Sequence, residues 1–355
     1  MPGYDPFPRG PFAAGVRTES LRRGGRSLPI EVWYPADGVP AGADLADPTR
    51  DHYELLPGFP SSWQDAVRDA APRAGRWPLV AFSHGYGGHR RQSTFLCTHL
   101  ASHGYVAVAV DHTGNTVFDV LHMVVAMQTG GPRPDPDTRL RDFIAARPAD
   151  VSFTIDSVLA GAGGVAGVVD PERIGMSGHS FGGWTTLRVT KQDARIRAAL
   201  PLAPAGGPNP RLPVSALTEA LEFDWGRDVP TLFVVADRDT VLPIAGMHHL
   251  LEQTPGRKRM VVVKNADHMH FCDRVEEVHE LFRMMPHDPV FADIQASIPP
   301  IAELCAGEHS QDVVRGLGLA HMDAHLKGDE SAARFLAGDV AGALAARGID
   351  IAVLP

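Results

Sequence analysis

The chain carries the stretch Gly178-His179-Ser180-Phe181-Gly182-Gly183 directly after an apolar run at residues 173–176, which predicts a β-strand. The stretch matches Gly-x-Ser-x-Gly, a pattern in which serine occupies a sharp turn between a strand and a helix. Glycines flank this turn because a side chain there would collide with neighbouring backbone. The sequence therefore predicts a nucleophile elbow that exposes the Ser180 hydroxyl. A glycine-rich turn can match this pattern by chance, so the residues downstream decide whether Ser180 is a catalytic nucleophile.

Two strand-like runs follow the elbow, and each ends in a candidate catalytic side chain. Residues 231–236 lead into Asp237-Arg238-Asp239, and residues 259–264 lead into Asn265-Ala266-Asp267-His268. The order serine, acid, histidine is that of the α/β-hydrolases and differs from the orders on the chymotrypsin and subtilisin folds.

The roles of the acid and the histidine follow from their chemistry and position. His268 is expected to act as general base and then general acid, because the pKa of histidine lies near the working pH. Asp239 is expected to orient His268 because it lies further past the strand end. Asp237 competes for this role, but we expect it to cap the turn instead.

A His- and Gly-rich turn, Ser83-His84-Gly85-Tyr86-Gly87-Gly88, ends an earlier strand-like run at residues 77–82. A tetrahedral intermediate carries an oxyanion, and α/β-hydrolases bind it with two backbone amides. One amide follows the nucleophile, and the other comes from the loop after the third strand. The sequence therefore predicts an oxyanion hole made by the amides of Phe181 and Tyr86.

The rest of the chain alternates between strand-like and helical patterns. Residues 15–21 and 28–35 flank Gly24-Gly25 and predict an antiparallel hairpin, which a polar connection follows to about residue 76. Residues 77–82 and 105–110 are short, continuous and apolar, as in buried parallel strands, with a helical pattern at 91–103 between them. The fold class is thus α/β, with a mostly parallel central sheet, helices on both faces and an N-terminal hairpin.

A helix is predicted to begin at about Pro148, a residue suited to a first helical turn, and to run to residue 159. The glycine cluster at residues 161–167 follows it. Because this cluster comes after a helix and before a strand, it reverses the context of a dinucleotide-binding loop and predicts a connection.

Composition fits one domain over residues 1–355. The chain has 355 residues, 44% hydrophobic and 21% charged, although length alone would allow two domains. Its formal net charge of -9 and its pI near 6.0 argue against nucleic acid as a partner. The N-terminus lacks a signal-peptide pattern and no run is long enough to span a membrane. We therefore expect a cytoplasmic protein, or a secreted one if a leader has been removed. Its oligomeric state stays open.

The three cysteines, Cys97, Cys272 and Cys305, do not form a disulfide framework. We expect separate thiols, although a bridge between Cys272 and Cys305 is an alternative. His268-Met269-His270-Phe271-Cys272-Asp273, with His248-His249 nearby, brings several ligand types together but matches no zinc-binding spacing. We expect neither a metal nor a cofactor.

Two segments are longer than the core requires. Residues 113–147 contain an apolar stretch at 117–127 and the Pro-rich loop Gly131-Pro132-Arg133-Pro134-Asp135-Pro136, and residues 270–308 are rich in Met, Phe, His and Pro. Both should emerge at the carboxyl edge of the sheet, where open α/β folds bind ligands. They are therefore candidate lids or pocket walls, or else they only pack on the core.

Three segments resemble the plasma type of platelet-activating factor acetylhydrolase and its bacterial relatives: residues 82–88, 101–107 and 178–183. The resemblance implies an α/β-hydrolase fold, serine esterase activity, no cofactor, and oxyanion donors at Tyr86 and Phe181. One feature departs from that family, since the strand at residues 198–204 carries no carboxylate. An acid at Asp239 instead resembles the dienelactone hydrolases and the bacterial polyester hydrolases.

The sequence thus predicts a serine hydrolase that cleaves small-molecule carboxylic esters through an acyl-enzyme on Ser180. The alternatives are an amidase with the same triad, or a hydrolase of polyesters and phthalate-type diesters. A non-catalytic binding protein on this scaffold is disfavoured, because nucleophile, base, acid and oxyanion loop are all present.

Overall fold

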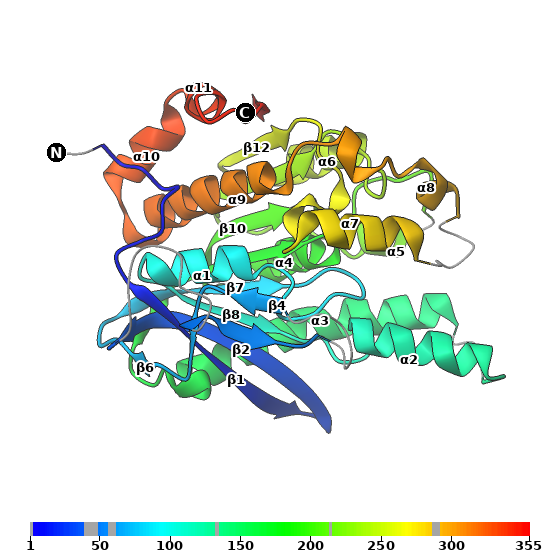
Figure 1. Ribbon diagram of the computed structural model, residues 1–355, viewed down its shortest axis with the longest axis horizontal. Coiled ribbons are helices and arrows are strands. Elements are labelled where there is room, and N and C mark those ends of the chain that lie inside the picture. The colour runs from blue at the N-terminus through cyan, green and yellow to red at the C-terminus, as the bar shows by residue number, and fades with distance from the viewer. Residues whose placement is uncertain (1–2, 39–48, 56–61, 132–134, 213–214, 286–291) are drawn as a thin grey trace.

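The computed structural model describes residues 3–38, 49–55, 62–131, 135–212, 215–285 and 292–355 (Figure 1). In these ranges one sheet of eleven strands has the order β13-β12-β11-β10-β9-β7-β8-β2-β1-β5, with β6 paired to β2. Its strands are β1 Ala13–Arg23, β2 Arg26–Asp37, β5 Val67–Arg68, β6 Ala71–Pro72, β7 Trp77–Ser83, β8 Val106–Val110, β9 Val169–His179, β10 Ile196–Leu202, β11 Thr231–Ala236, β12 Lys258–Val263 and β13 Ile351–Leu354.

The centre of the sheet is parallel, from β8 through β7, β9, β10 and β11 to β12. β1 and β2 form the antiparallel hairpin predicted around Gly24-Gly25, and β2 joins it to β8. The last strand, β13, runs antiparallel to β12. The mostly parallel sheet with its N-terminal hairpin confirms the predicted fold class. The carboxyl ends of the six parallel strands meet at one edge of this sheet.

Alternate residues of the strands point to opposite faces, as the pleat requires. Along β7, Val80 and Phe82 enter one core cluster and Leu79 and Ala81 another. The helices α1 Thr94–Ser102 and α9 Gly307–Met322 cover the first face. The helices α3 Pro136–Leu159, α4 Phe181–Gln192 and α6 Ile244–Gln253 cover the second. The predicted helices on both faces are thus present.

Smaller elements complete the described chain. They are the hairpin β3 Asp51–Tyr53 with β4 Ser62–Gln64, α2 Val117–Gln128, α5 Ser215–Glu219, α7 Val275–Met284, α8 Ala292–Ser297, α10 Glu330–Ala337, α11 Val340–Ala345, the 3₁₀ turns η2 Ala162–Gly164, η3 His268–Phe271 and η5 Ile301–Glu303, and the π-helical turn η6 Asp323–Lys327. The polar connection predicted up to residue 76 therefore holds four short strands, β3 to β6, whose two- and three-residue lengths gave no periodic signal.

The predicted start of α3 at Pro148 is wrong. The helix begins twelve residues earlier at Pro136, where the Asp135 side chain accepts a hydrogen bond from the Thr138 amide at 2.9 Å. Proline does mark the first turn, but it is Pro136, and Pro148 lies inside the helix. The predicted Pro-rich loop at residues 131–136 lies partly outside the described residues, which leave out 132–134. Figure 1 shows α2 and the first half of α3 extending beyond the sheet.

Candidate active site

The stretch from Gly178 to Gly183 forms a sharp turn between β9 and α4. Ser180 has φ 59° and ψ -118°, a backbone conformation that costs a non-glycine residue roughly 1–3 kcal/mol. Two backbone hydrogen bonds hold it there, from the Ser180 amide to the Leu202 carbonyl at 2.9 Å and from the Ala205 amide to the Ser180 carbonyl at 2.9 Å. The surrounding structure thus stabilises a strained serine at the carboxyl edge of the sheet.

The glycines of this turn are required by close backbone contacts. A Cβ at Gly178 would lie 2.7 Å from the Ser83 carbonyl oxygen, and one at Gly183 would lie 2.7 Å from the Cα of Pro204. A Cβ at Gly182 would overlap the Ser83 carbonyl oxygen itself. Because these neighbours are backbone atoms, no side-chain rotation can relieve the clash.

Gly182→Ala is therefore expected to lower the free energy of unfolding by at least about 3 kcal/mol, since β7 or α4 must move to admit the methyl group. Urea denaturation followed by circular dichroism measures this loss. Gly338→Ala is the matched control, because its Cβ would meet carbonyl oxygens at 3.4 Å without a positive φ. Equal stability of the two variants would contradict the close packing at the turn.

His268 joins Ser180 to Asp239 through two hydrogen bonds. Its Nε2 lies 2.9 Å from Ser180 Oγ, and its Nδ1 lies 2.8 Å from Asp239 Oδ2. A carboxylate can only accept, so Nδ1 carries the proton and Nε2 is free to accept from the Ser180 hydroxyl. The structure thus brings together all three residues that were predicted from strand order. The side chains of His268 and Asp239 are only 6% and 1% exposed, which shields their hydrogen bond from water.

Asp239 also builds the turn that carries it. Its second oxygen, Oδ1, accepts hydrogen bonds from the amides of Val241 at 3.0 Å and Leu242 at 2.7 Å. The expectation that Asp237 caps this turn is therefore wrong. Asp237 Oδ2 instead pairs with Lys264 Nζ at 3.6 Å. The two carboxylates lie two residues apart, and only Asp239 is directed at the imidazole.

The pKa of His268 reflects two opposed influences. Burial disfavours the imidazolium and lowers the pKa, whereas the charge of Asp239 and its hydrogen bond raise it. The carboxylate prevails, and the pKa of His268 lies above its ordinary value. The neighbouring His179 behaves in the opposite way, because burial and the proximity of His268 hold its pKa well below the usual range.

Three polar residues that sequence reasoning did not select tie the loops of the site together. Asp267 Oδ1 accepts from the amides of His268 at 2.7 Å and Thr240 at 2.8 Å, which joins the histidine loop to the acid loop. Gln92 Oε1 accepts from the Gly85 amide at 2.8 Å, and its Nε2 donates to His179 Nδ1 at 3.0 Å. His179 Nε2 in turn donates to the His268 carbonyl at 3.0 Å. Asp267 and His179 each lie next to a triad residue in the sequence, whereas Gln92 offered no signal.

The loop after β7 lies against the elbow. A Cβ at Gly85 would be 3.5 Å from the Cβ of Ser180, so the next residue, Tyr86, follows directly beside the serine. Within the described ranges, neither the Tyr86 amide nor the Phe181 amide donates a hydrogen bond to a protein acceptor. Both predicted oxyanion donors are thus adjacent to the serine and have free N–H groups, one of them at the N-terminus of α4.

A second group of a serine, a histidine and an aspartate, linked in that order by close contacts, lies under this loop. Ser83 Oγ is 2.9 Å from His112 Nε2, and His112 Nδ1 is 3.2 Å from Asp150 Oδ2. The side chains of His112 and Asp150 are 1% and 0% exposed, and Ser83 is fully buried. Because Ser83 is fully buried, no substrate carbonyl can reach it, which separates this group of contacts from the triad at Ser180.

The candidate metal and disulfide residues form neither kind of site in the described chain. Within the described ranges, no three His, Cys, Asp or Glu side chains lie close enough together to hold a metal ion. Cys97, Cys272 and Cys305 are free thiols. His270 Nε2 contacts the Cys305 carbonyl at 3.1 Å, so it serves to join two loops. Among the described helices, none is both long and apolar enough to cross a membrane.

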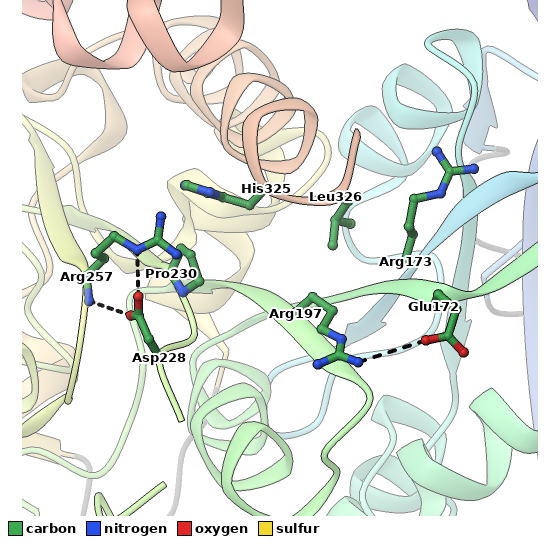
Figure 2. A pocket seen from close by; sticks show the side chains of 8 residues that line it. All are labelled: Glu172, Arg173, Arg197, Asp228, Pro230, Arg257, His325 and Leu326. Atoms are coloured by element: carbon green, nitrogen blue, oxygen red, sulfur yellow. Dashed lines mark hydrogen bonds and ion pairs between the residues drawn. The ribbon is translucent and has the colours of Figure 1, made fainter. Parts of the chain in front are cut away.

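A polar cavity of about 320 Å³ lies at the opposite edge of the sheet, near the amino ends of β9 to β12 (Figure 2). Arg257 pairs there with Asp228 at 2.7 Å, and Arg197 lies 4.0 Å from Glu172. Because these charges largely pair with each other and the triad lies at the carboxyl edge, this cavity is not part of the candidate active site.

Both long segments adjoin the triad. The Val117 amide at the start of α2 donates to the Gly88 carbonyl at 3.0 Å, and Tyr86 and Phe143 rings pack edge to face at 6.1 Å. In the second segment, His279 of α7 lies 4.0 Å from Asp267, which supports the histidine loop. α2 has no buried residue, so its apolar side chains stay accessible beside the site.

The sheet, the strained turn at Ser180 and the two loops that bring Asp239 and His268 to it define an α/β-hydrolase. A family model described as PETase, PET hydrolase-like, matches residues 69–282. The chain belongs to this PET hydrolase-like family, and the predicted likeness to bacterial polyester hydrolases is confirmed.

The relatives of the chain are ester hydrolases by name. Cutinase est1 of Thermobifida alba is 32% identical over 169 residues, which cover 47% of this chain and 44% of that protein. Bis(hydroxyethyl) terephthalate hydrolase of Streptomyces coelicolor is 30% identical over 172 residues, 48% of this chain and 43% of that one. The aligned region thus spans less than half of these curated relatives. A ferulic acid esterase structure from Streptomyces cinnamoneus has a TM-score of 0.61, 26% identity, and coverage of 91% of this chain and 92% of the other.

Proposed function

We propose that this protein hydrolyses carboxylic esters through an acyl-enzyme on Ser180. The observation that carries the proposal is the continuous hydrogen-bonded chain from Asp239 through His268 to Ser180 Oγ, at 2.8 and 2.9 Å. These distances let the imidazole take the hydroxyl proton as the oxygen attacks a carbonyl. The strained turn leaves Ser180 only partly buried, at the edge where substrate arrives.

Acylation begins when Ser180 Oγ attacks the ester carbonyl carbon and its proton moves to His268 Nε2. Asp239 stabilises the imidazolium through the hydrogen bond at Nδ1. The carbonyl oxygen becomes an oxyanion, which the Tyr86 and Phe181 amides are proposed to bind. His268 then gives its proton to the alkoxide that leaves, and the product alcohol departs.

Deacylation repeats these steps with water as the nucleophile. His268 removes a proton from the water, the hydroxide adds to the acyl carbonyl, and Ser180 leaves with the proton returned by His268. Each preorganised amide at the oxyanion is worth roughly 3–4 kcal/mol of barrier, judged by the loss of one donor in another enzyme. The residues of this chain supply every proton transfer that the reaction requires.

For the substrate class, we propose esters of bulky or aromatic acids, including diesters and polyesters. Two relatives carry terephthalate and ferulic acid in their names, and both are aromatic acids. In this chain Tyr86 is 49% exposed beside the site, and α2, whose apolar side chains are accessible, contacts the same loop at Gly87 and Gly88. We propose that residues 113–147 and 270–308 form the walls or lids of the acyl site within one domain.

A fluorophosphonate probe tests the reaction class. It should form an adduct on Ser180 that peptide mass spectrometry locates, and pretreatment should block hydrolysis of p-nitrophenyl esters. No Ser180 adduct, together with no turnover, would favour a non-catalytic binding protein on this scaffold.

A panel of substrates tests the finer proposal. Ester chains from acetate to dodecanoate, benzoate and terephthalate diesters, and the matching anilides should be compared by kcat/KM. We expect turnover of the aromatic diesters and much slower cleavage of anilides, because an amine is a poorer leaving group than an alcohol. Anilides cleaved as fast as esters would support the amidase alternative, and rapid turnover of short esters alone would overturn the proposed substrate class.

The pH dependence of kcat/KM should show an acid limb with its midpoint above 6.5. His268 must be neutral to accept the proton, and its pKa is raised by Asp239 despite burial. Activity is therefore present above this pKa and is lost as the pH falls through it. In Asp239→Asn the raising carboxylate is gone, so the limb of the residual activity should move to lower pH. A wild-type midpoint well below 6.5 would contradict the charge assignment.

A further inference from the structure

Arg147 is a buried cation that forms no ion pair within 4.0 Å among the described residues, although the charge of Asp150 acts on it from further away. Its residue is 0% exposed in the middle of α3. Among the described residues, no carboxylate oxygen lies within 4.0 Å of its guanidinium, and the acid one turn away, Asp150, is paired with Arg26 at 2.7 Å. A buried charge without a counter-ion costs free energy, so such a residue needs a reason. Burial lowers the pKa of Arg147 to about 9, which still leaves it protonated at neutral pH.

The hydrogen bonds that Arg147 donates around the loop after β7 go to neutral oxygens, and its Nη2 also lies 3.4 Å from His84 Nδ1. It donates to the His84 carbonyl at 2.7 Å, to the Gly85 carbonyl at 3.0 Å and to Ser83 Oγ at 3.3 Å. Two further bonds, at 2.6 and 3.1 Å, go to Asn115 Oδ1. The guanidinium thus fastens the loop that supplies one of the two proposed oxyanion donors.

The Gly85 carbonyl is the decisive acceptor, because it shares a peptide group with the Tyr86 amide. It accepts from Arg147 Nη2, from the Gly88 amide at 3.2 Å and from His84 Nδ1 at 2.7 Å. The His84 proton is on Nδ1 because Nε2 accepts from the His112 amide at 3.1 Å. Donors at a carbonyl oxygen polarise the whole peptide group and make its N–H a stronger donor.

The other proposed donor also lies against Arg147. The centre of the guanidinium is 4.3 Å from the ring centroid of Phe181, which is the residue after the nucleophile. This cation–π contact holds the Phe181 ring, and with it the first turn of α4, against α3. One side chain therefore contacts both Phe181 and the carbonyl of the peptide group that carries the Tyr86 amide.

We propose that Arg147 is a positioning residue for ester hydrolysis, which fixes the peptide group between Gly85 and Tyr86 and places a positive charge behind both oxyanion donors. This inference rests on the proposed function, because it assigns Arg147 to the same reaction. The charge acts at short range in a water-excluded interior, where electrostatic interactions are strongest. The interaction of this charge with the substrate carbonyl oxygen is stronger in the transition state than in the ground state, because only the transition state carries a full negative charge on that oxygen.

The test compares Arg147→Met, Arg147→Lys and Asn115→Asp with the control Arg141→Gln, an exposed arginine on the same helix. Asn115→Asp is nearly isosteric and leaves Arg147 in place, but it sets a carboxylate beside the guanidinium. Asn115 Nδ2 has no hydrogen-bond partner among the described residues, so this change removes no existing bond at that atom. The ion pair should hold the loop at least as firmly while it neutralises the charge.

Measurements are kcat and KM for a p-nitrophenyl ester, the inhibition constant of phenylboronic acid, and the melting temperature. Boronic acid forms a tetrahedral anion on the serine and so reports on oxyanion binding. We expect kcat to fall about 100-fold in Arg147→Met and about 10-fold in Asn115→Asp, with KM within about threefold. Arg147→Lys should fall between wild type and Arg147→Met, because it keeps the charge without the planar set of donors. Inhibition by the boronate should weaken by the same factors.

A merely structural role predicts a different pattern. It would lower the melting temperature of the Arg147 variants while the folded fraction, counted by fluorophosphonate titration, kept wild-type kcat. Unchanged kcat in Asn115→Asp would overturn the proposal even if the Arg147 variants do not fold. The proposed function fails separately: wild-type turnover that survives Ser180→Ala would refute it, whereas Ser180-dependent turnover with unaffected Asn115→Asp refutes only the role of Arg147.

Discussion

Ser180→Ala is expected to lower kcat for an activated ester by about 10⁴-fold or more, because alanine has no oxygen that can form the acyl-enzyme. The remaining rate would come from binding and from the oxyanion amides acting on water. The methyl group fits the strained turn without new contacts, so the circular dichroism spectrum and the melting temperature should stay near those of the wild type. Stopped-flow release of p-nitrophenol measures the change.

Ser177→Ala is the matched control for this experiment. Ser177 lies three residues earlier on β9, and its hydroxyl donates to the Leu200 carbonyl at 2.8 Å inside the sheet. Its loss should cost about 1 kcal/mol of stability and leave kcat within about threefold. Retained turnover in Ser180→Ala would refute the acyl-enzyme, and equal losses in both variants would show that the strand itself had been disturbed.

Asp239→Asn is expected to lower kcat by about 10³- to 10⁴-fold, whereas Asp237→Asn should change it less than about threefold. An asparagine in place of Asp239 can present its amide N–H to His268 Nδ1, which favours the tautomer with the proton on Nε2. That tautomer cannot accept the Ser180 proton. Asp237 loses only its contact to Lys264, at 3.6 Å.

The pair of variants also separates structure from chemistry. In Asp239→Asn, the side-chain oxygen that remains can still accept the turn hydrogen bonds from Val241 and Leu242, so the fold should persist. Steady-state kinetics on both variants, together with melting curves, decide the assignment. A larger loss in Asp237→Asn would reverse it, and equal losses would show that neither carboxylate alone orients the imidazole.

Local patterns predicted the central elements because strand periodicity and turn chemistry act over a few residues. The parallel strands β7, β8, β11 and β12 lie within about one residue of their predicted ranges, and the hairpin of β1 and β2 turns at Gly24-Gly25 as expected. The start of α3 was misplaced because two prolines, Pro136 and Pro148, satisfy the same local rule. The short strands β3 to β6 form only through their partners and have no pattern of their own.

Beyond the predicted triad, which polar residues act together could not be read from the chain. Ser83, His112 and Asp150 make contacts like those of the triad, and their burial excludes substrate. Arg147 and Gln92 are single polar residues on or near helices, with no motif around them. Their roles depend on contacts with loops more than fifty residues away or with the elbow. Only the packing of the sheet brings these segments together.

The sequence by itself determined the type and order of the reactive groups: a serine between glycines, then an acid and a histidine, each directly after an apolar strand. Since the carboxyl ends of parallel strands meet at one edge, that order already implied that the three groups converge. The sequence favoured Asp239 over Asp237 only by its position past the strand end, and the tertiary structure adds the contact itself, with Asp239 Oδ2 2.8 Å from His268 Nδ1. Tertiary structure alone placed Arg147 under the oxyanion loop, because hydrogen bonding and burial depend on distances across the fold and not along the chain.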